Sequence, residues 1–200
     1  AMASIKDKVS VSIQWRAFEL NPDPHLVPEP ILPALSKKYG RSEEEMRASQ
    51  QSMMQVAADL GLNFAKMQQR FTCNTFDAHR LLKWAAAAYP ATAAQSVSAQ
   101  TALKLALFEA YFGRAEQVSE HDVLLRCVAA AGLDADAAAQ VLLSTQFADD
   151  VRAEEAAYQQ AGISSVPAFV INQRYLISGA QDPATLAASL LQIADEMTTD

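Results

Sequence analysis

The chain has 200 residues, of which half are hydrophobic and a fifth are charged. A chain of this length buries roughly 70% of the surface that its unfolded form exposes, so it can build a full core. Its formal net charge of −7 would repel a phosphate backbone, and no cluster of Lys and Arg offsets that repulsion. The composition therefore predicts a folded, largely helical protein that does not bind nucleic acid.

Two further classes of protein are excluded by what the sequence lacks. No apolar run approaches the roughly 18 to 20 residues that span a bilayer, and the first residues do not form a charged-then-apolar leader. Cys73 and Cys127 do not have the spacing of metal ligands or of a disulfide framework. We expect a cytoplasmic protein with reduced thiols, no metal site and no membrane partner.

The first element with a clear period is a strand. Residues 9–16 alternate apolar and polar side chains, which is typical of a strand with one face on a core. Residues 1–8 favour a helix and lead straight into this strand, as if the chain began inside a helix. A frayed end or a tag remnant explains residues 1–3 equally well.

A long helical block follows a proline-rich loop. Five prolines between residues 21 and 33 fix the backbone and remove amide donors, so this stretch is predicted to be an extended surface loop. Beyond it, helical periodicity and capping residues predict helices over residues 43–61, 76–89, 98–113, 121–132, 135–143 and 146–162. The charged residues of the last of these helices are expected to form a solvated face.

The final segment returns to strands. "AFVI" and "RYLISG" flank Asn172 and Gln173, and this pattern predicts a β-hairpin. Asp182 and Pro183 then have the properties of the cap and the first residue of a last helix. "AFVI" is apolar throughout, as in a strand covered on both faces, yet three strands leave it with an open edge. We therefore expect that an N-terminal strand and the first turns of its helix are missing from the chain.

With that strand restored, the order of elements is β-α-β, a helical insertion and β-β-α. The chain then resembles the FrnE-like branch of the DsbA family of thioredoxin-fold oxidoreductases, along nearly its whole length. The resemblance rests on five blocks in order: "WRAFELNPD" (15–23), "NTFDAHRLLKWA" (74–85), "ALFEAYF" (106–112), "GISSVPAFVIN" (162–172) and "ISGAQ" (177–181).

The resemblance implies an α/β fold, with a thioredoxin-like sheet that is incomplete at the N-terminus and a large all-helical insertion domain. The implied domains are residues 1–36 and 162–200, which form the thioredoxin-like part, and residues 37–161, which form the insertion.

The same resemblance implies thiol-disulfide exchange. Family members carry a Cys-x-x-Cys dithiol at the start of their first helix, where the helix end stabilises a thiolate. This chain has no such motif, so as given it is expected to be inactive. Val166-Pro167 matches the family's cis-proline loop, which lies against the reactive sulfurs and exposes the preceding backbone to the substrate.

The block after Cys73 supplies the other residues near the family's site. Asn74 and Thr75 suit a helix cap, and Asp77 suits the positive end of that helix. His79 and Arg80 either pack inside the protein or face a cleft and bind a thiolate or a carboxylate. Together with Ser165, these five residues are the expected substrate-binding groups.

Two other functions remain open. A glutathione-dependent isomerase of the 2-hydroxychromene-2-carboxylate type has the same fold and a similar Val-Pro loop, and it would use glutathione where the oxidoreductase needs no cofactor. A redox-inactive binding or chaperone module is the third possibility. The expected partners are protein or small-molecule thiols and disulfides, and unpaired strand edges favour a homodimer.

Overall fold

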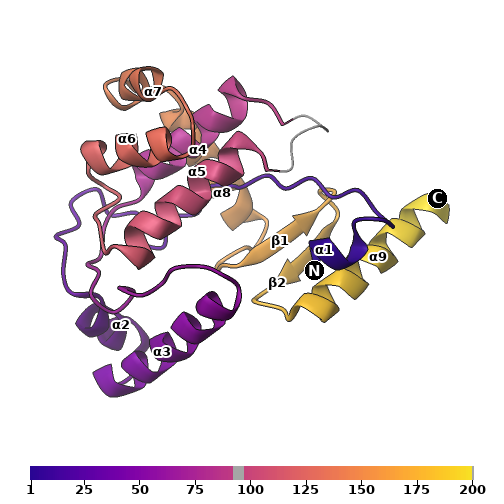
Figure 1. Cartoon of the computed structure of the whole chain (residues 1–200), viewed down its shortest axis with the longest axis horizontal. Helices are drawn as coiled ribbons and strands as arrows, with labels where there is room; N and C mark the ends of the chain where they lie inside the picture. Colours follow the sequence, from indigo (N-terminus) through magenta and orange to yellow (C-terminus); the bar gives the residue numbers. More distant parts are fainter. Residues whose placement is uncertain (92–96, 200) are drawn as a thin grey trace. The chain divides into compact units, whose positions relative to one another are not determined.

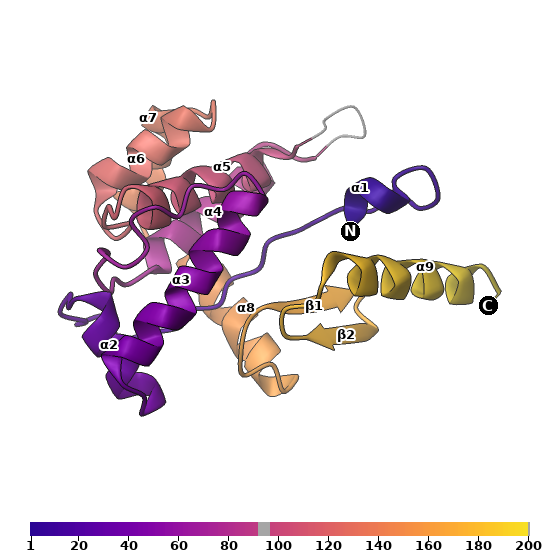
Figure 2. The ribbon, with the colours of Figure 1, turned by 60° about the horizontal axis from the view of Figure 1, so that its bottom comes forward.

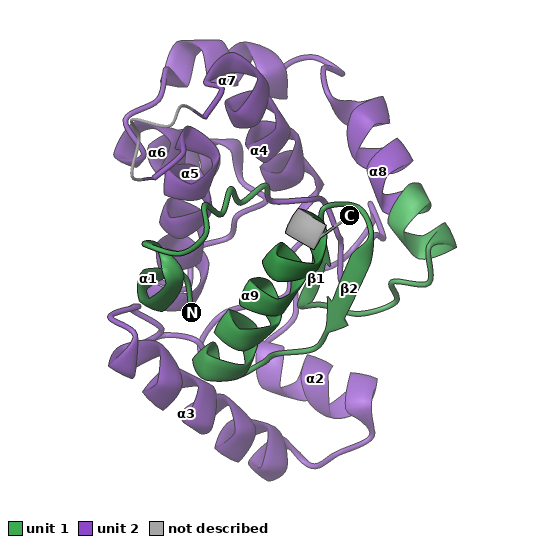
Figure 3. Ribbon diagram, turned by 90° about the vertical axis from the view of Figure 1, so that its right-hand side faces the viewer, with its two compact units in different colours: residues 1–14, 156–200 green, residues 15–155 purple. Residues whose placement is uncertain are grey.

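The computed structural model describes residues 1–91 and 97–199, which divide into two compact units (Figure 3). Unit 1 contains residues 1–14 and 156–200, and unit 2 contains residues 15–155. Helix α8 (Ala148–Gln160) begins in unit 2 and ends in unit 1. None of the described helices is both long and apolar enough to span a bilayer.

The core of unit 2 is a group of helices: α4 (Phe76–Ala88), α5 (Ala99–Phe108), α6 (His121–Ala130) and α7 (Ala135–Leu142) (Figure 1). Each helix turns an apolar stripe inward, because residues three and four apart share a face. The completely buried side chains of this core are Leu81, Ala85, Leu103, Ala110, Leu124, Val128 and Ala138. The expected helix over residues 98–113 is correct, but its last part is a π-helix, η1 (Glu109–Gly113).

Helices α2 (Ile31–Tyr39) and α3 (Glu43–Asp59) form a smaller hairpin beside this core (Figure 2). The Ser42 side chain accepts a bond from the Glu45 N–H, and the Glu45 carboxylate accepts one from the Ser42 N–H, so the two residues form a capping box. The end of the expected proline loop is helical, because a proline such as Pro33 is tolerated in a first helical turn.

The expected strand over residues 9–16 does not form. The chain is extended there, but its backbone N–H and C=O groups do not form hydrogen bonds with another strand in the described structure. From Trp15 onward, side chains from helices form the hydrogen bonds with this backbone that a neighbouring strand would otherwise form. Gln100 accepts from the Trp15 N–H (2.9 Å) and donates to the Trp15 carbonyl (2.9 Å), and Glu154 accepts from the Ala17 N–H (2.8 Å). A strand needs a neighbouring strand for its backbone groups, which the alternating pattern does not supply.

Unit 1 contains the predicted hairpin. Strand β1 (Ala168–Ile171) pairs antiparallel with β2 (Tyr175–Ser178), with Phe169 opposite Ile177 and Val170 opposite Leu176. Asn172 and Gln173 both have positive φ angles, as the centre of a type I′ turn requires, and the Arg174 N–H donates to the Ile171 carbonyl.

The other elements of unit 1 are the short helix α1 (Met2–Ile5) and the last helix α9 (Pro183–Thr199), which contact each other. Helix α1 lies within residues 1–8, which the sequence predicts to favour a helix. The Asp182 carboxylate accepts bonds from the N–H groups of Ala184 and Thr185 (3.0 Å each), so the predicted cap of α9 is also confirmed. Helix α9 lies along the hairpin in both views (Figures 1 and 2).

Candidate functional site

The loop that precedes β1 is held at both ends and exposed between them. Helix α8 ends at Gln160. Gly162 follows it with a φ of 83°, which favours glycine, and the buried Ile163 donates its N–H to the Tyr158 carbonyl. At the other end, the Gly179 N–H donates to the Pro167 carbonyl (2.9 Å), which fixes the proline beside β2. Residues 164–167 between these anchors are exposed.

This loop contains the cis-proline bond that the family resemblance implies. The Val166-Pro167 peptide bond is cis. Val166 keeps 44% of its surface exposed, and Ser165 is exposed as well. The loop therefore presents backbone and a hydroxyl group to the outside of unit 1.

The start of α4 supplies the second group of expected site residues, in unit 2. The side chain of Asn74, not that of Thr75, provides the cap: its Oδ1 accepts from the Phe76 N–H (2.9 Å). Thr75 occupies the N-cap position directly before the helix, but its side chain makes no capping bond. Asn74 Nδ2 also donates to Glu19 (3.0 Å), so this amide joins α4 to the extended segment that contains Trp15.

Arg80 is buried, with only 4% of its surface exposed. Its guanidinium donates to the carbonyls of Val141, Ser144 and Gln146 and to the Asp77 carboxylate (2.7 Å). These partners lie at the end of α7, in the turn that follows it and on α4 itself. The contacts give Arg80 a structural role in unit 2, namely to join α4 to the α7–α8 connection.

His79 is also buried, at 8% exposure. Burial, and next the nearby charge of Lys104, lower the pKa of His79 to about 4, while a hydrogen bond with the Phe18 backbone partly opposes the shift. The imidazole is therefore neutral at physiological pH. Of the two positions that the sequence allows for His79, inside the protein or facing a cleft, the structure has the first.

The structure contains a group of charged residues around Glu19 that the sequence analysis does not include among the expected site residues. Arg152 donates to the carboxylates of Glu19 and Glu155, and its guanidinium lies 4.0 Å from the centre of the Phe76 ring. The Glu19 N–H in turn donates to Glu155 (3.0 Å). Burial raises the pKa of Glu19, against the hydrogen bond and charge of Arg152.

The predicted solvated face of α8 is therefore wrong where it includes Glu154 and Glu155, whose side chains are each only 10% exposed. Both carboxylates accept bonds from the extended segment, which the charge pattern of a single helix does not reveal. Glu154 also pairs with Lys83 (3.1 Å) and Arg16 (3.0 Å). These contacts fix the segment that contains Trp15 against α8 within unit 2.

Both thiols are buried and free, as the sequence analysis expects. Burial raises the pKa of Cys73, partly opposed by a hydrogen bond with Tyr111. Burial also raises the pKa of Cys127 to about 11. Disulfide exchange needs a thiolate, so neither side chain has the properties of an attacking sulfur.

This inertness can be measured directly. We expect that neither thiol of the native chain reacts with Ellman's reagent on the time scale of free cysteine, because both are buried and protonated. After unfolding in guanidinium chloride, both should react. Rapid reaction of one thiol in the native chain, lost in the corresponding Cys→Ser variant, would show that this sulfur is accessible.

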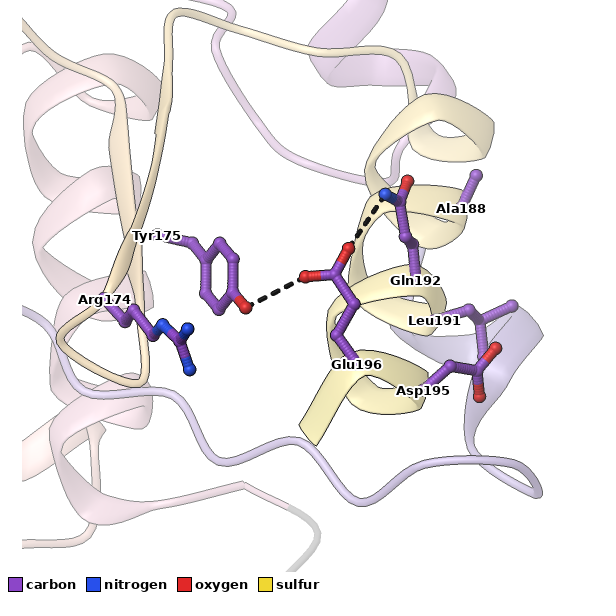
Figure 4. A pocket seen from close by; sticks show the side chains of 7 residues that line it. All are labelled: Arg174, Tyr175, Ala188, Leu191, Gln192, Asp195 and Glu196. Atoms are coloured by element: carbon purple, nitrogen blue, oxygen red, sulfur yellow. Dashed lines mark hydrogen bonds between the residues drawn. The ribbon is translucent and has the colours of Figure 1, made fainter. Parts of the chain in front are cut away.

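A hollow of about 810 Å³ lies in unit 1 between β2 and α9 (Figure 4). Tyr175 donates to Glu196 (2.9 Å), and Gln192 donates to the other oxygen of the same carboxylate (3.1 Å). These two bonds lower the pKa of Glu196. The hollow contains no thiol or imidazole, because its lining residues are Arg174, Tyr175, Ala188, Leu191, Gln192, Asp195 and Glu196.

The expected site residues thus form two groups. Ser165, Val166 and Pro167 lie together in the loop before β1, in unit 1. Asn74, Thr75, Asp77, His79 and Arg80 lie together around the start of α4, in unit 2. Within the described residues, no set of three or more His, Cys, Asp or Glu side chains is arranged to hold a metal ion.

Residues 1–191 match the DSBA-like thioredoxin domain. The chain belongs to the DsbA-like thioredoxin family. A crystal structure of a probable DsbA oxidoreductase from Streptomyces coelicolor is similar, with a TM-score of 0.77 and 34% identity over 90% of this chain and 73% of that one. No curated protein sequence matches the chain. These findings confirm the DsbA-like thioredoxin fold and place the chain in a family of oxidoreductases.

Proposed function

We propose that the protein is a thiol-disulfide oxidoreductase in which the Pro167 loop is the substrate-facing part of the site. The observation that carries this proposal is the loop itself. In a chain that matches the family over residues 1–191, Val166 and Pro167 are exposed and directly precede β1. The substrate would be a protein or small-molecule disulfide, and the reaction needs no cofactor.

The chemistry follows from sulfur exchange. A thiolate attacks one sulfur of the substrate disulfide, a mixed disulfide forms, and the other substrate sulfur leaves as a thiolate. A second thiolate of the enzyme then displaces the first substrate sulfur, so the substrate is reduced and the enzyme dithiol is oxidised. Cys73 and Cys127 do not fit either step, because both are buried and have raised pKa values. The proposal therefore requires a dithiol that is not among these 200 residues and whose sulfurs face the Pro167 loop.

The first test uses the 200-residue chain in an insulin-reduction assay with dithiothreitol. We expect the background rate, and the same rate for the Cys73→Ser/Cys127→Ser double variant. A rate above background that the double variant loses would overturn the assignment of both thiols as inert.

The second test joins the chain to the residues encoded directly before Ala1 in its gene. If these residues contain a Cys-x-x-Cys pair, we expect insulin reduction that disappears when the first cysteine of that pair is replaced by serine. An upstream sequence without a cysteine pair would contradict the proposal. So would tight binding of glutathione in a calorimetric titration together with no insulin reduction, which is the behaviour of the isomerase.

A further inference from the structure

Helix α5 carries a lysine whose ammonium group has no acceptor. Lys104 is part-buried, and burial lowers the pKa of its ammonium group. Its Nζ lies 4.9 Å from the centre of the Phe108 ring and 5.8 Å from the centre of the Trp15 ring. Among the residues that the structure describes, no carboxylate or carbonyl forms an ion pair or a hydrogen bond with this ammonium. It has therefore lost part of its water and gained two aromatic faces in exchange.

The acidic side chains of unit 2 are paired with other cations. The charge of Glu154 acts on His79, as the charge of Lys104 does, yet Glu154 pairs with Lys83 of the neighbouring helix α4 (3.1 Å). The chain has 23 acidic residues against 16 Lys and Arg, so a shortage of carboxylates does not explain why Lys104 has no partner. A part-buried charge without a partner costs free energy, and an anion bound beside it would offset that cost.

The polar groups next to this ammonium already have partners within unit 2. The Trp15 indole Nε1–H donates to Thr101 Oγ1 (2.9 Å). The Gln100 side chain accepts from the Trp15 N–H and donates to the Trp15 carbonyl (2.9 Å each). These bonds fix the indole from both its ring and its backbone. Lys104 is thus held beside a fixed aromatic surface, and its own N–H donors are the ones left for a ligand.

We propose that Lys104 binds the carboxylate of a small organic acid, whose apolar body lies beside the part-buried rings of Trp15 and Phe108. The ammonium supplies a single positive charge, and the buried His79 is neutral at physiological pH and adds none. One charge matches a carboxylate better than it matches a phosphate monoester, which carries nearly two. Because burial has removed part of its water, this ammonium forms a stronger charge-assisted bond than an exposed lysine does.

The indole signals in an NMR spectrum test this site, because the chain contains two tryptophans. Titration of the 200-residue chain with sodium benzoate, at constant pH and ionic strength, should shift the Trp15 indole signal and saturate at about millimolar concentration. The signal of Trp84, which is buried in the core, should stay in place and is the internal control. Benzamide has the shape of benzoate without its charge, so it should bind at least about tenfold more weakly.

Substitution of the lysine tests its role. Lys104→Met removes the charge but keeps an apolar stem of similar length, and it should weaken benzoate binding at least about tenfold. Lys104→Gln serves if the methionine variant is misfolded by circular dichroism. The matched control is Lys37→Met, at an exposed lysine of α2, which should bind benzoate as the wild type does.

Three results would overturn the proposal. They are a Trp15 signal that benzoate leaves in place, equal shifts with benzoate and benzamide, and unchanged affinity in a folded Lys104 variant. None of these measurements involves a dithiol, so their outcome is independent of the insulin-reduction tests.

Discussion

Replacing Arg80 with leucine should lower the free energy of unfolding by about 3 to 5 kcal/mol. The buried guanidinium donates to three carbonyls at and after the end of α7. The carbonyls of Ser144 and Gln146 lose this bond in the variant, whereas the Val141 carbonyl keeps its bonds from the Ser144 N–H (3.2 Å) and hydroxyl (3.0 Å). Unsatisfied buried carbonyls cost about 1 to 3 kcal/mol each when water cannot reach them. Urea unfolding followed by the fluorescence of the buried Trp84 measures the change.

Arg126→Leu is the matched control for this variant. Arg126 also forms two ion pairs, with Asp122 (2.8 Å) and Glu116 (3.1 Å), but its side chain is 54% exposed. Exposed pairs contribute about 0 to 1 kcal/mol, so this variant should be nearly as stable as the wild type. A loss below about 1 kcal/mol for Arg80→Leu would contradict the structural role of Arg80 and would reopen its assignment to the substrate.

The stability of the protein should fall as the pH is lowered from about 6.5 to about 4, with a contribution from His79 of about 1.4 kcal/mol per pH unit. The folded-state pKa of His79 is depressed, so in this window the unfolded chain binds a proton that the folded chain does not. Protons therefore favour the unfolded state, and the contribution is fully present only above the unfolded pKa. Guanidinium unfolding at a series of pH values measures the slope.

His79→Gln isolates this contribution, since glutamine keeps a polar side chain but does not titrate. The comparison uses the slopes of stability against pH, so a constant loss from the substitution itself does not matter. Glu19 acts with the opposite sign, because a carboxyl with a raised pKa loses stability as the pH rises through that value, and it is present in both proteins. Equal slopes for the wild type and the variant would show that folding does not lower the pKa of His79.

Local signals in the sequence predict the ends of several elements and the hairpin correctly. Ser42 with Glu45, Ser98, Asp134 and Asp182 all cap the helices that they precede. Capping depends on bonds within one turn of helix, so a few neighbouring residues are enough to predict it. The same holds for the turn at Asn172, which needs only residues that tolerate a positive φ.

Predictions that depend on distant partners succeed less well. The apolar Met53 and Val56 of α3, and Leu60 directly after it, are exposed, whereas the polar Gln50 of the same helix is buried. The charges of α8 look solvated in sequence, yet two of its carboxylates hold the backbone of the segment that contains Trp15. Which side of a helix meets the rest of the chain is decided by packing, which periodicity alone does not encode.

For this protein the sequence alone determined the resemblance to DsbA proteins, the Val-Pro loop and the absence of a Cys-x-x-Cys pair, because each depends only on the identity and order of residues along the chain. Only the tertiary structure decided that residues 9–16 do not form a strand and that Arg80 and His79 are packed inside unit 2. Each of these depends on which distant group satisfies a backbone or side-chain hydrogen bond, and burial fixes that choice only when the chain is folded.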